Sequence, residues 1–329
     1  MVVETIKLNN GYEMPIFGLG TMFAKEDVGI QAVKDAIDLG YRHFDTAHLY
    51  GNEKQVGDGI RAKIAEGVVK REDIFVVTKL WNTYHEPDKV ELACRNSCNK
   101  LGLDYIDLYL MHSPMGFEHR GDTEADLFPK NAEGTVLFKY IFATMSTTVD
   151  TYKAMEKLVA SGLVRSIGVS NFNSEQIDRL LANCTIKPVT NQIEVGPSLN
   201  QKKLTKFCKE RDIVITGFSP LGRPYNAGLN PDLPPLAFLD PRVIAIGEKY
   251  GKTGAQVVLR YLFQLGVVLI PKSSNKQRMK ENIDIFDFEL KEDEVALLET
   301  FNTGTRTLQL NYHQVKYYNH KYFPNHIEF

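Results

Sequence analysis

Short runs of strand-type residues alternate with longer amphipathic stretches along this 329-residue chain. Alternation of this kind predicts parallel strands joined by crossover helices. The expected strands are 16–21, 43–46, 74–80, 106–112, 164–170, 189–194, 214–219 and 267–271. The expected helices include 27–39, 54–65, 88–101, 150–161, 174–181, 201–210 and 254–265.

The number of strand-like runs favours a closed barrel over an open doubly wound sheet. Eight runs fit a (β/α)8 TIM barrel, and the length suits one such domain over residues 1–329. Runs such as IFVVTK are nearly all apolar, as expected of strands covered on both faces. An Asn10-Gly11 pair between two short apolar stretches predicts an N-terminal β-hairpin.

Three segments do not fit the repeating unit. Long connections over 114–149 and 221–240 leave the C-terminal ends of strands, where barrel active sites are built. Connections of this length usually serve as lids or binding loops. The aromatic-rich C-terminal tail, 301–329, either folds over the same mouth or covers the outside of the barrel.

Composition excludes several classes of partner. A formal net charge of −2 gives no reason to expect nucleic acid or an anionic membrane. The four cysteines do not complete a zinc set, so free thiols and no metal are expected. No signal peptide or membrane-length apolar run is recognised, which predicts a cytoplasmic protein. Nothing in the sequence argues against a monomer.

Polar residues end three successive expected strands. Asp45 ends the second, Lys79 the third and His112 the fourth. Alone, each is more often a solvated loop charge or a structural histidine. The barrel, however, brings these strand ends to one rim, which makes a shared site the better interpretation.

Tyr50 completes a set that makes chemical sense. A carbonyl that accepts hydride becomes an alkoxide and needs a proton, and a phenol has a pKa of about 10. An ammonium such as that of Lys79 favours the phenolate and lowers this pKa. Asp45 can hold Lys79 in place, and His112 can orient the carbonyl. Taken alone, Tyr50 would more often be a packing residue.

The chain resembles the aldo-keto reductase superfamily, in its aldose-reductase-like branch. The segments FDTAHLYGNE, VVTKLWNTYH, LMHSP, IGVSNF, TNQIE, GFSPLG and IPKSSNKQR carry the match in family order, and NFNSEQ, LANCTIKPVTNQ and HKYFPNHIEF are most similar to insect members. The resemblance implies that Asp45, Tyr50, Lys79 and His112 are the catalytic tetrad and that NADPH is the cofactor. The cofactor contacts that it implies are Gly20, Thr21, Met22, Ser170, Asn171, Gln192, Phe218, Ser219, Leu221, Lys272, Ser273, Ser274, Arg278, Glu281 and Asn282.

Within that set, the resemblance gives each group a part of the cofactor. Ser170, Asn171 and Gln192 would hold the nicotinamide carboxamide, and Phe218 would stack on the ring. The Pro-Lys-Ser-Ser loop also stands on its own physics, because it combines hydroxyls, an ammonium and the N–H donors of a helix start. Arg278 adds a fork suited to phosphate oxygens, which favours NADPH over NADH. If this motif stood alone, a basic solvated helix start would explain it.

A second glycine pattern is a decoy. Residues 57–62, GDGIRA, fit the G-x-G-x-x-G/A fingerprint of dinucleotide-binding folds. The pattern lies inside a helical stretch and does not follow a strand, so the required context is missing. We interpret it as chance.

The chain departs from the branch at the expected substrate pocket. The branch usually has Trp where this chain has Met22 and Ser113, and Tyr where it has Phe218. Smaller or softer walls predict a roomier pocket. The expected pocket residues are Met22, His48, Trp81, Ser113, Phe117 and Phe128. The apolar stretch VLFKYIFATM, 136–145, is expected to line the pocket as well, unless it only docks on the barrel.

These features predict NADPH-dependent reduction of aldehydes and ketones. Generic reduction of aldehydes and ketones ranks first, with aromatic, terpenoid or lipid-derived aldehydes among the possible substrates. Reduction of 3-dehydroecdysteroid or other steroid-type ketones ranks second. The resemblance leaves one alternative open, because some members of the superfamily serve as NADPH-binding regulatory barrels or as crystallins without physiological turnover.

Overall fold

The computed structural model describes residues 4–24, 26–131, 136, 148–223, 233–308, 323–327 and 329. At its centre lies an eight-stranded sheet of parallel strands, in the order β3 to β10 along both the sequence and the sheet. The strands are β3 (Leu19–Gly20), β4 (His43–Asp45), β5 (Phe75–Leu80), β6 (Ile106–Met111), β7 (Val164–Ser170), β8 (Thr190–Glu194), β9 (Val214–Phe218) and β10 (Val267–Leu269).

The two edges of this sheet meet, so it closes into a barrel. Gly18 donates its backbone N–H to Leu269 O at 2.8 Å, and Leu269 donates to Ile16 O at 3.1 Å. Parallel bridges pair Phe17 with Leu269 and Gly20 with Lys272. The first strand is shorter than the expected 16–21. Only Leu19 and Gly20 pair with β4, whereas the contacts with the β10 segment are the isolated bridges at Phe17 and Gly20.

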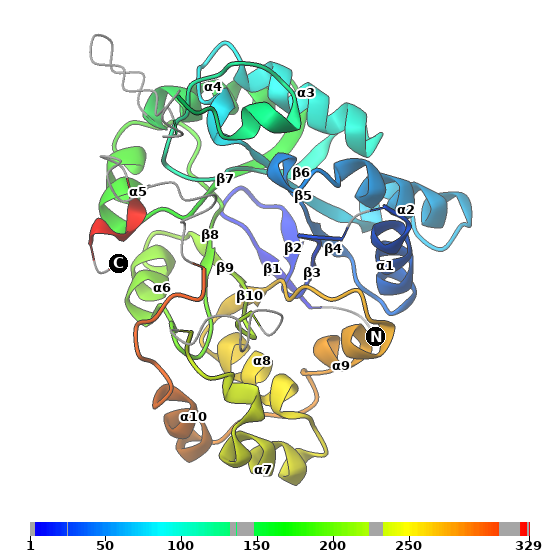
Figure 1. Cartoon of the computed structure of the whole chain (residues 1–329), viewed down its shortest axis with the longest axis vertical. Helices are drawn as coiled ribbons and strands as arrows, with labels where there is room; N and C mark the ends of the chain where they lie inside the picture. Colours follow the sequence, from blue (N-terminus) through cyan, green and yellow to red (C-terminus); the bar gives the residue numbers. More distant parts are fainter. Residues whose placement is uncertain are drawn as a thin grey trace.

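Helices form a ring around the strands (Figure 1). Along the chain, at least one helix lies between each pair of successive strands of the barrel. Two further helices, α7 and α10, were not predicted from the sequence pattern. The helices are α1 (Glu26–Asp38), α2 (Glu53–Ala65), α3 (Val90–Leu101), α4 (Thr148–Ala160), α5 (Ser174–Leu181), α6 (Lys202–Lys209), α7 (Pro241–Tyr250), α8 (Gly254–Gln264), α9 (Lys276–Ile283) and α10 (Glu292–Glu299).

The expected N-terminal hairpin closes the bottom of the barrel. Strands β1 (Thr5–Lys7) and β2 (Glu13–Pro15) pair antiparallel around the turn that contains Asn10 and Gly11. Leu8, Met14 and Ile16 join inward-facing residues such as Val77 and Leu110 in one buried cluster. The N-terminal end of the barrel is therefore filled with apolar side chains, which leaves the C-terminal end for the site.

The decoy glycines lie inside α2, as the sequence pattern predicted, and they have a packing role. A methyl group at Gly57 would lie 1.9 Å from Leu101 O, and one at Gly59 would lie 2.8 Å from the Val33 side chain. These glycines let α2 approach α3 and α1 closely. The segment lies within a helix and does not directly follow a strand, so the context that a phosphate-binding loop requires is missing.

Three sequence expectations concern the stretch 136–145, the cysteines and membrane-spanning segments. Apart from the buried Val136, the stretch 136–145 lies outside the described residues. All four cysteines are free thiols. No helix in the described part of the chain combines the length and apolarity that crossing a membrane requires.

Candidate active site

The period-2 alternation of the strands positions the first members of the site. In β5, Phe75 and Val77 point into the apolar lower barrel, and Lys79 follows two residues later on the same face. In β6, Leu108 and Leu110 do the same, and His112 follows at the strand end. Lys79 and His112 therefore lie above the apolar layers, at the C-terminal mouth.

Lys79 is fully buried, and its ammonium has three acceptors. It donates to Asp45 Oδ1 at 2.6 Å, to Thr46 O at 2.8 Å and to the Tyr50 hydroxyl at 3.5 Å. Burial lowers the pKa of Lys79, and the charge and hydrogen bond of Asp45 oppose that shift. An ammonium N–H is thus available to the phenolic oxygen of Tyr50.

A second clamp fixes Asp45. Gln192, on β8 across the barrel, donates its side-chain amide to Asp45 Oδ2 at 2.7 Å. Both carboxylate oxygens are therefore engaged, one by Lys79 and one by Gln192. Sequence reasoning assigned Gln192 only to the cofactor, and the structure adds this contact between distant strands.

Tyr50 belongs to a short 3-10 helix, His48–Tyr50, that the buried Asn52 holds in place. Asn52 donates to Thr21 O at 2.7 Å and accepts from Thr46 Oγ1 at 2.7 Å. It therefore joins the end of β3 to the end of β4, two residues beyond Tyr50. Sequence reasoning did not identify Asn52, although its place in the motif YGNE was visible.

His112 faces the ring of Tyr50, with ring centroids 5.8 Å apart. Burial lowers its pKa well below the usual value, and the charge of Lys79 adds to the shift, so the imidazole is neutral. Its Nδ1 is buried and has no hydrogen-bond partner among the described residues. A buried N–H without an acceptor is costly, so the proton belongs on Nε2.

A cavity of about 890 Å³ opens above these residues. Its wall includes Asp45, Tyr50 and His112, while Lys79 lies beneath it. Every residue named above as a cofactor contact lines it: Gly20, Thr21, Met22, Ser170, Asn171, Gln192, Phe218, Ser219, Leu221, Lys272, Ser273, Ser274, Arg278, Glu281 and Asn282.

Two positively charged side chains, Lys272 and Arg278, line one part of the cavity. Neither Lys272 nor Arg278 forms an ion pair with a described carboxylate. Lys272 lies in the loop before α9, and Arg278 lies in the first turn of α9, where Asn275 caps the helix. Partial burial and the charge of Arg278 lower the pKa of Lys272. Two cations that repel each other beside a helix N-terminus are suited to hold an anion such as a phosphate.

The expected substrate residues divide into two groups. Met22, Trp81 and Ser113 line the cavity. Phe117 is buried behind Trp81, with ring centroids 5.8 Å apart, and Phe128 packs on Trp81 at 5.3 Å. These two phenylalanines support a wall residue and are not part of the wall among the described residues.

His48 is also placed away from the cavity. Its ring lies 5.3 Å from that of Tyr84, and its neighbour Leu49 lines the cavity instead. In a 3-10 helix adjacent side chains point about 120° apart, so only one of the two faces the site. Asn82, Met115 and Leu308 also line the cavity and were not identified from the sequence.

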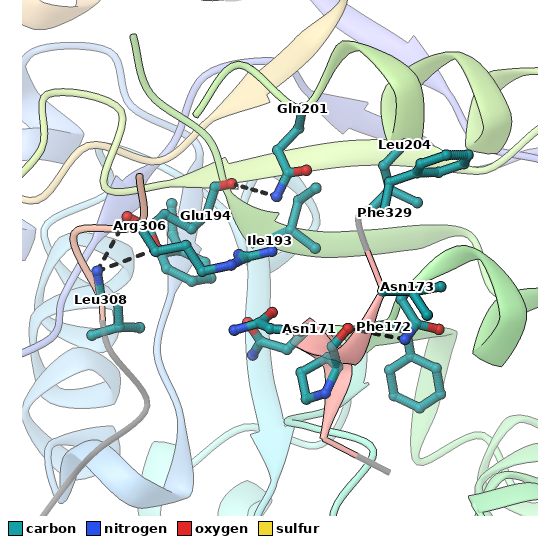
Figure 2. A pocket seen from close by; sticks show the side chains of 14 residues that line it. Asn171, Phe172, Asn173, Ile193, Glu194, Gln201, Leu204, Arg306, Leu308 and Phe329 are labelled. Atoms are coloured by element: carbon teal, nitrogen blue, oxygen red, sulfur yellow. Dashed lines mark hydrogen bonds between the residues drawn. The ribbon is translucent and has the colours of Figure 1, made fainter. Parts of the chain in front are cut away.

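A smaller pocket lies beside the cavity and shares Asn171, Phe218 and Leu308 with it (Figure 2). Here the buried Glu194 of β8 accepts hydrogen bonds from Thr307 N and Thr307 Oγ1, both at 2.6 Å, and from Leu308 N. These hydrogen bonds hold the start of the tail at the barrel mouth. Of the two expected positions for the tail, its start therefore takes the one over the mouth.

The comparisons with known proteins agree with this geometry. The Aldo/keto reductase family profile matches residues 16–303. The chain belongs to the aldo/keto reductase family. The members of this family are oxidoreductases that act on carbonyl compounds.

Relatives of this aldo/keto reductase match along nearly their whole length. Aldo-keto reductase family 1 member A1-A of Danio rerio is 45% identical, over 93% of this chain and 91% of that protein. Dihydrodiol dehydrogenase 3 of Bos taurus is 44% identical, over 93% and 94%.

Solved structures give the same result. An aldo-keto reductase of Bombyx mori (AKR2E4), solved in complex with NADP, superposes with a TM-score of 0.87 at 41% identity, covering 99% of this chain and 100% of that one. The aldose reductase of Schistosoma japonicum gives 0.88 at 37% identity, with the same coverage. The likeness to an insect structure agrees with the insect-like phrases in the sequence.

Proposed function

We propose that this chain, acting as a single barrel domain, reduces aldehydes and ketones to alcohols with NADPH, and that Tyr50 is the proton donor. The observation that carries the proposal is the buried Lys79 ammonium, which lies 2.6 Å from Asp45 Oδ1 and 3.5 Å from the Tyr50 hydroxyl. An ammonium in this position stabilises the phenolate that remains after Tyr50 has given up its proton.

The residues of the cavity fit NADPH. Lys272 and Arg278, which pair with no described carboxylate, suit the 2′-phosphate, and the ring of Phe218 also lines the cavity. The Ser170 hydroxyl donates to Gln192 O and accepts from Asn171 Nδ2, which holds Asn171 beside the mouth. Bound NADPH supplies the hydride, and the chain's part is to bind, orient and protonate.

The remaining steps belong to the chain. His112, neutral with its proton on Nε2, donates a hydrogen bond to the carbonyl oxygen and orients the substrate. Tyr50 then protonates the alkoxide oxygen, and Lys79 stabilises the phenolate. Asp45 and Gln192 keep Lys79 in place throughout. Proximity and orientation supply much of the remaining acceleration.

Tyr50→Phe tests the assignment of the acid. We expect turnover to fall by roughly 10²–10⁴-fold or more, because general acid catalysis contributes about that much. NADPH binding, measured by fluorescence quenching, should stay near the wild-type level. Tyr12→Phe, on the exposed surface of the hairpin, is the matched control. Turnover retained in Tyr50→Phe would overturn the role of Tyr50.

A substrate panel followed by NADPH absorbance tests the reaction class. We expect aromatic and lipid-derived aldehydes to be reduced, with steroid-type ketones as the second group. If NADPH binds and no aldehyde, quinone or steroid ketone is reduced, the chain is better explained as an NADPH-binding module.

A further inference from the structure

Asn82 is a polar residue on the cavity wall that the proposed reaction does not use. It follows Trp81 directly and begins the short helix Asn82–Tyr84. Its backbone oxygen accepts from Phe117 N at 2.9 Å, which fixes its position, and its side chain is buried. Trp81, His112 and Ser113 lie with it on the same wall.

Ser113 determines which end of the Asn82 amide points away from it. Ser113 Oγ accepts a hydrogen bond from Met115 N at 3.2 Å, and its own hydrogen goes to Asn82 Oδ1 at 2.9 Å. Since Ser113 is buried, its hydroxyl hydrogen needs this acceptor. The carbonyl end of the amide therefore faces Ser113.

The amide nitrogen of Asn82 is left as a free donor. It donates to no described residue. It is not among the fully buried polar atoms without a hydrogen-bond partner, so it is accessible from the cavity that Asn82 lines. The indole N–H of Trp81 is not available in the same way, because it donates to Leu127 O at 2.8 Å.

We propose that Asn82 Nδ2 binds a second hydrogen-bond acceptor of the substrate, at a distance from the reacting carbonyl. The preferred substrates are then carbonyl compounds that carry an additional keto, ether or hydroxyl oxygen. The inference rests on the proposed function, in which Tyr50 and His112 engage the reacting oxygen. A polar group that is paired by one substrate and left unpaired by its analogue discriminates against the analogue.

The test is a series of straight-chain aldehydes of equal length, plain or with one keto group at successive carbons. The wild-type protein should prefer one position of the keto group. In Asn82→Leu, the ratio of kcat/KM for this keto aldehyde to that for the plain aldehyde should fall by about tenfold, the order that one hydrogen bond contributes. Asn183→Leu, an asparagine of the outer surface, should leave the ratio unchanged.

Two further variants separate binding from structure. Ser113→Ala removes the group that orients the amide and should lower the same ratio by a smaller factor. Asn82→Asp replaces the donor by an acceptor, so the preference should move from keto to hydroxy aldehydes. An unchanged ratio in Asn82→Leu and Ser113→Ala overturns the inference while the proposed function stands. A wild-type protein that reduces none of the series overturns both.

Discussion

At the scale of single residues, the site depends on how its charges are compensated. Lys79 is charged and fully buried, which is tolerated because each of its three N–H groups has an oxygen acceptor. Asp45 is held at both oxygens. Lys272 and Arg278 are the opposite case, since neither pairs with a carboxylate of the described residues, and so they suit an anionic ligand.

Arg278→Leu should therefore change the choice of cofactor. Loss of a charged hydrogen bond of about 1.5–3 kcal/mol lowers kcat/KM for NADPH by roughly tenfold to hundredfold. The value for NADH should hardly change, because NADH lacks the 2′-phosphate. Steady-state kinetics with both cofactors measure this. Arg95→Leu, at a residue that pairs with Glu91 on the exposed face of α3, is the control. An equal loss for both cofactors would contradict the phosphate site.

Buried histidines contribute to the pH dependence of stability. Burial lowers the pKa of His48 from its usual value near 6.5 to about 4, and burial also lowers those of His43 and His112. Between the folded and unfolded pKa values of these histidines the unfolded chain binds more of their protons, so their contribution to the free energy of unfolding rises with pH over that window and levels off above about pH 6.5. Each histidine contributes a slope of up to about 1.4 kcal/mol per pH unit.

His48→Gln should flatten this dependence between about pH 4 and pH 6.5. The free energy of unfolding, measured by denaturant titration across this range, should show a lower slope than in the wild-type protein. Parallel curves for the two proteins would show that His48 is not held neutral in the folded state.

At the scale of elements, the alternation of side chains along a strand and the helical repeat determine which residues face the core. Strand alternation puts apolar residues such as Val77 below and the polar Lys79 above on one face. In α2 the glycines mark the contact lines with neighbouring helices. The glycine spacing that resembles a nucleotide-binding motif thus serves helix packing. This packing role becomes visible only from the neighbouring helices.

Gly57→Ala should destabilise the protein although it improves helix propensity. An alanine in a helix is usually better than glycine by about 1 kcal/mol. At Gly57 the added methyl would lie 1.9 Å from Leu101 O on α3, so overpacking should cost roughly 1–3 kcal/mol or more. Thermal denaturation should show a lower Tm. A raised Tm would mean that α2 and α3 are not this close.

At the scale of the whole molecule, the tail joins segments far apart in sequence. Asn173, just beyond β7, donates to Pro324 O at 2.9 Å, and Ser174 Oγ donates to Phe329 O at 2.6 Å. The C-terminus consequently lies beside α5 and α6 (Figure 1). Together with the Glu194 bonds to Thr307 and Leu308, these contacts place the described ends of the tail around the mouth.

Glu194→Ala should release the start of the tail. Three hydrogen bonds to a buried carboxylate are lost, and Leu308 leaves the cavity wall. Since partial burial of a leucine against a ligand contributes on the order of 1 kcal/mol, KM for an apolar aldehyde should rise by roughly fivefold.

Limited proteolysis should cut Glu194→Ala near Thr307 faster than the wild-type protein. Glu194→Gln keeps one amide oxygen as acceptor and should show a smaller change in both measurements. A tail equally protected in all three proteins would contradict the role of Glu194.

From the sequence alone, the alternation of elements, the closing hairpin and the polar strand ends were predictable, because each depends on neighbours along the chain. Asp45, Lys79 and His112 follow from strand position, and their joining with Tyr50 follows from chemistry and family resemblance. The boundaries of most strands and helices agree with the structure to within about three residues.

Only the tertiary structure decided which side chains face the cavity and which face one another. Leu49 lies on the wall in place of His48, and Phe117 supports Trp81 from behind. Gln192 reaches Asp45 across the barrel, and Ser113 turns the amide of Asn82. The physical reason is that sequence periodicity determines the face of an element, whereas the rotation of a short helix and contacts between distant strands depend on how the elements pack together.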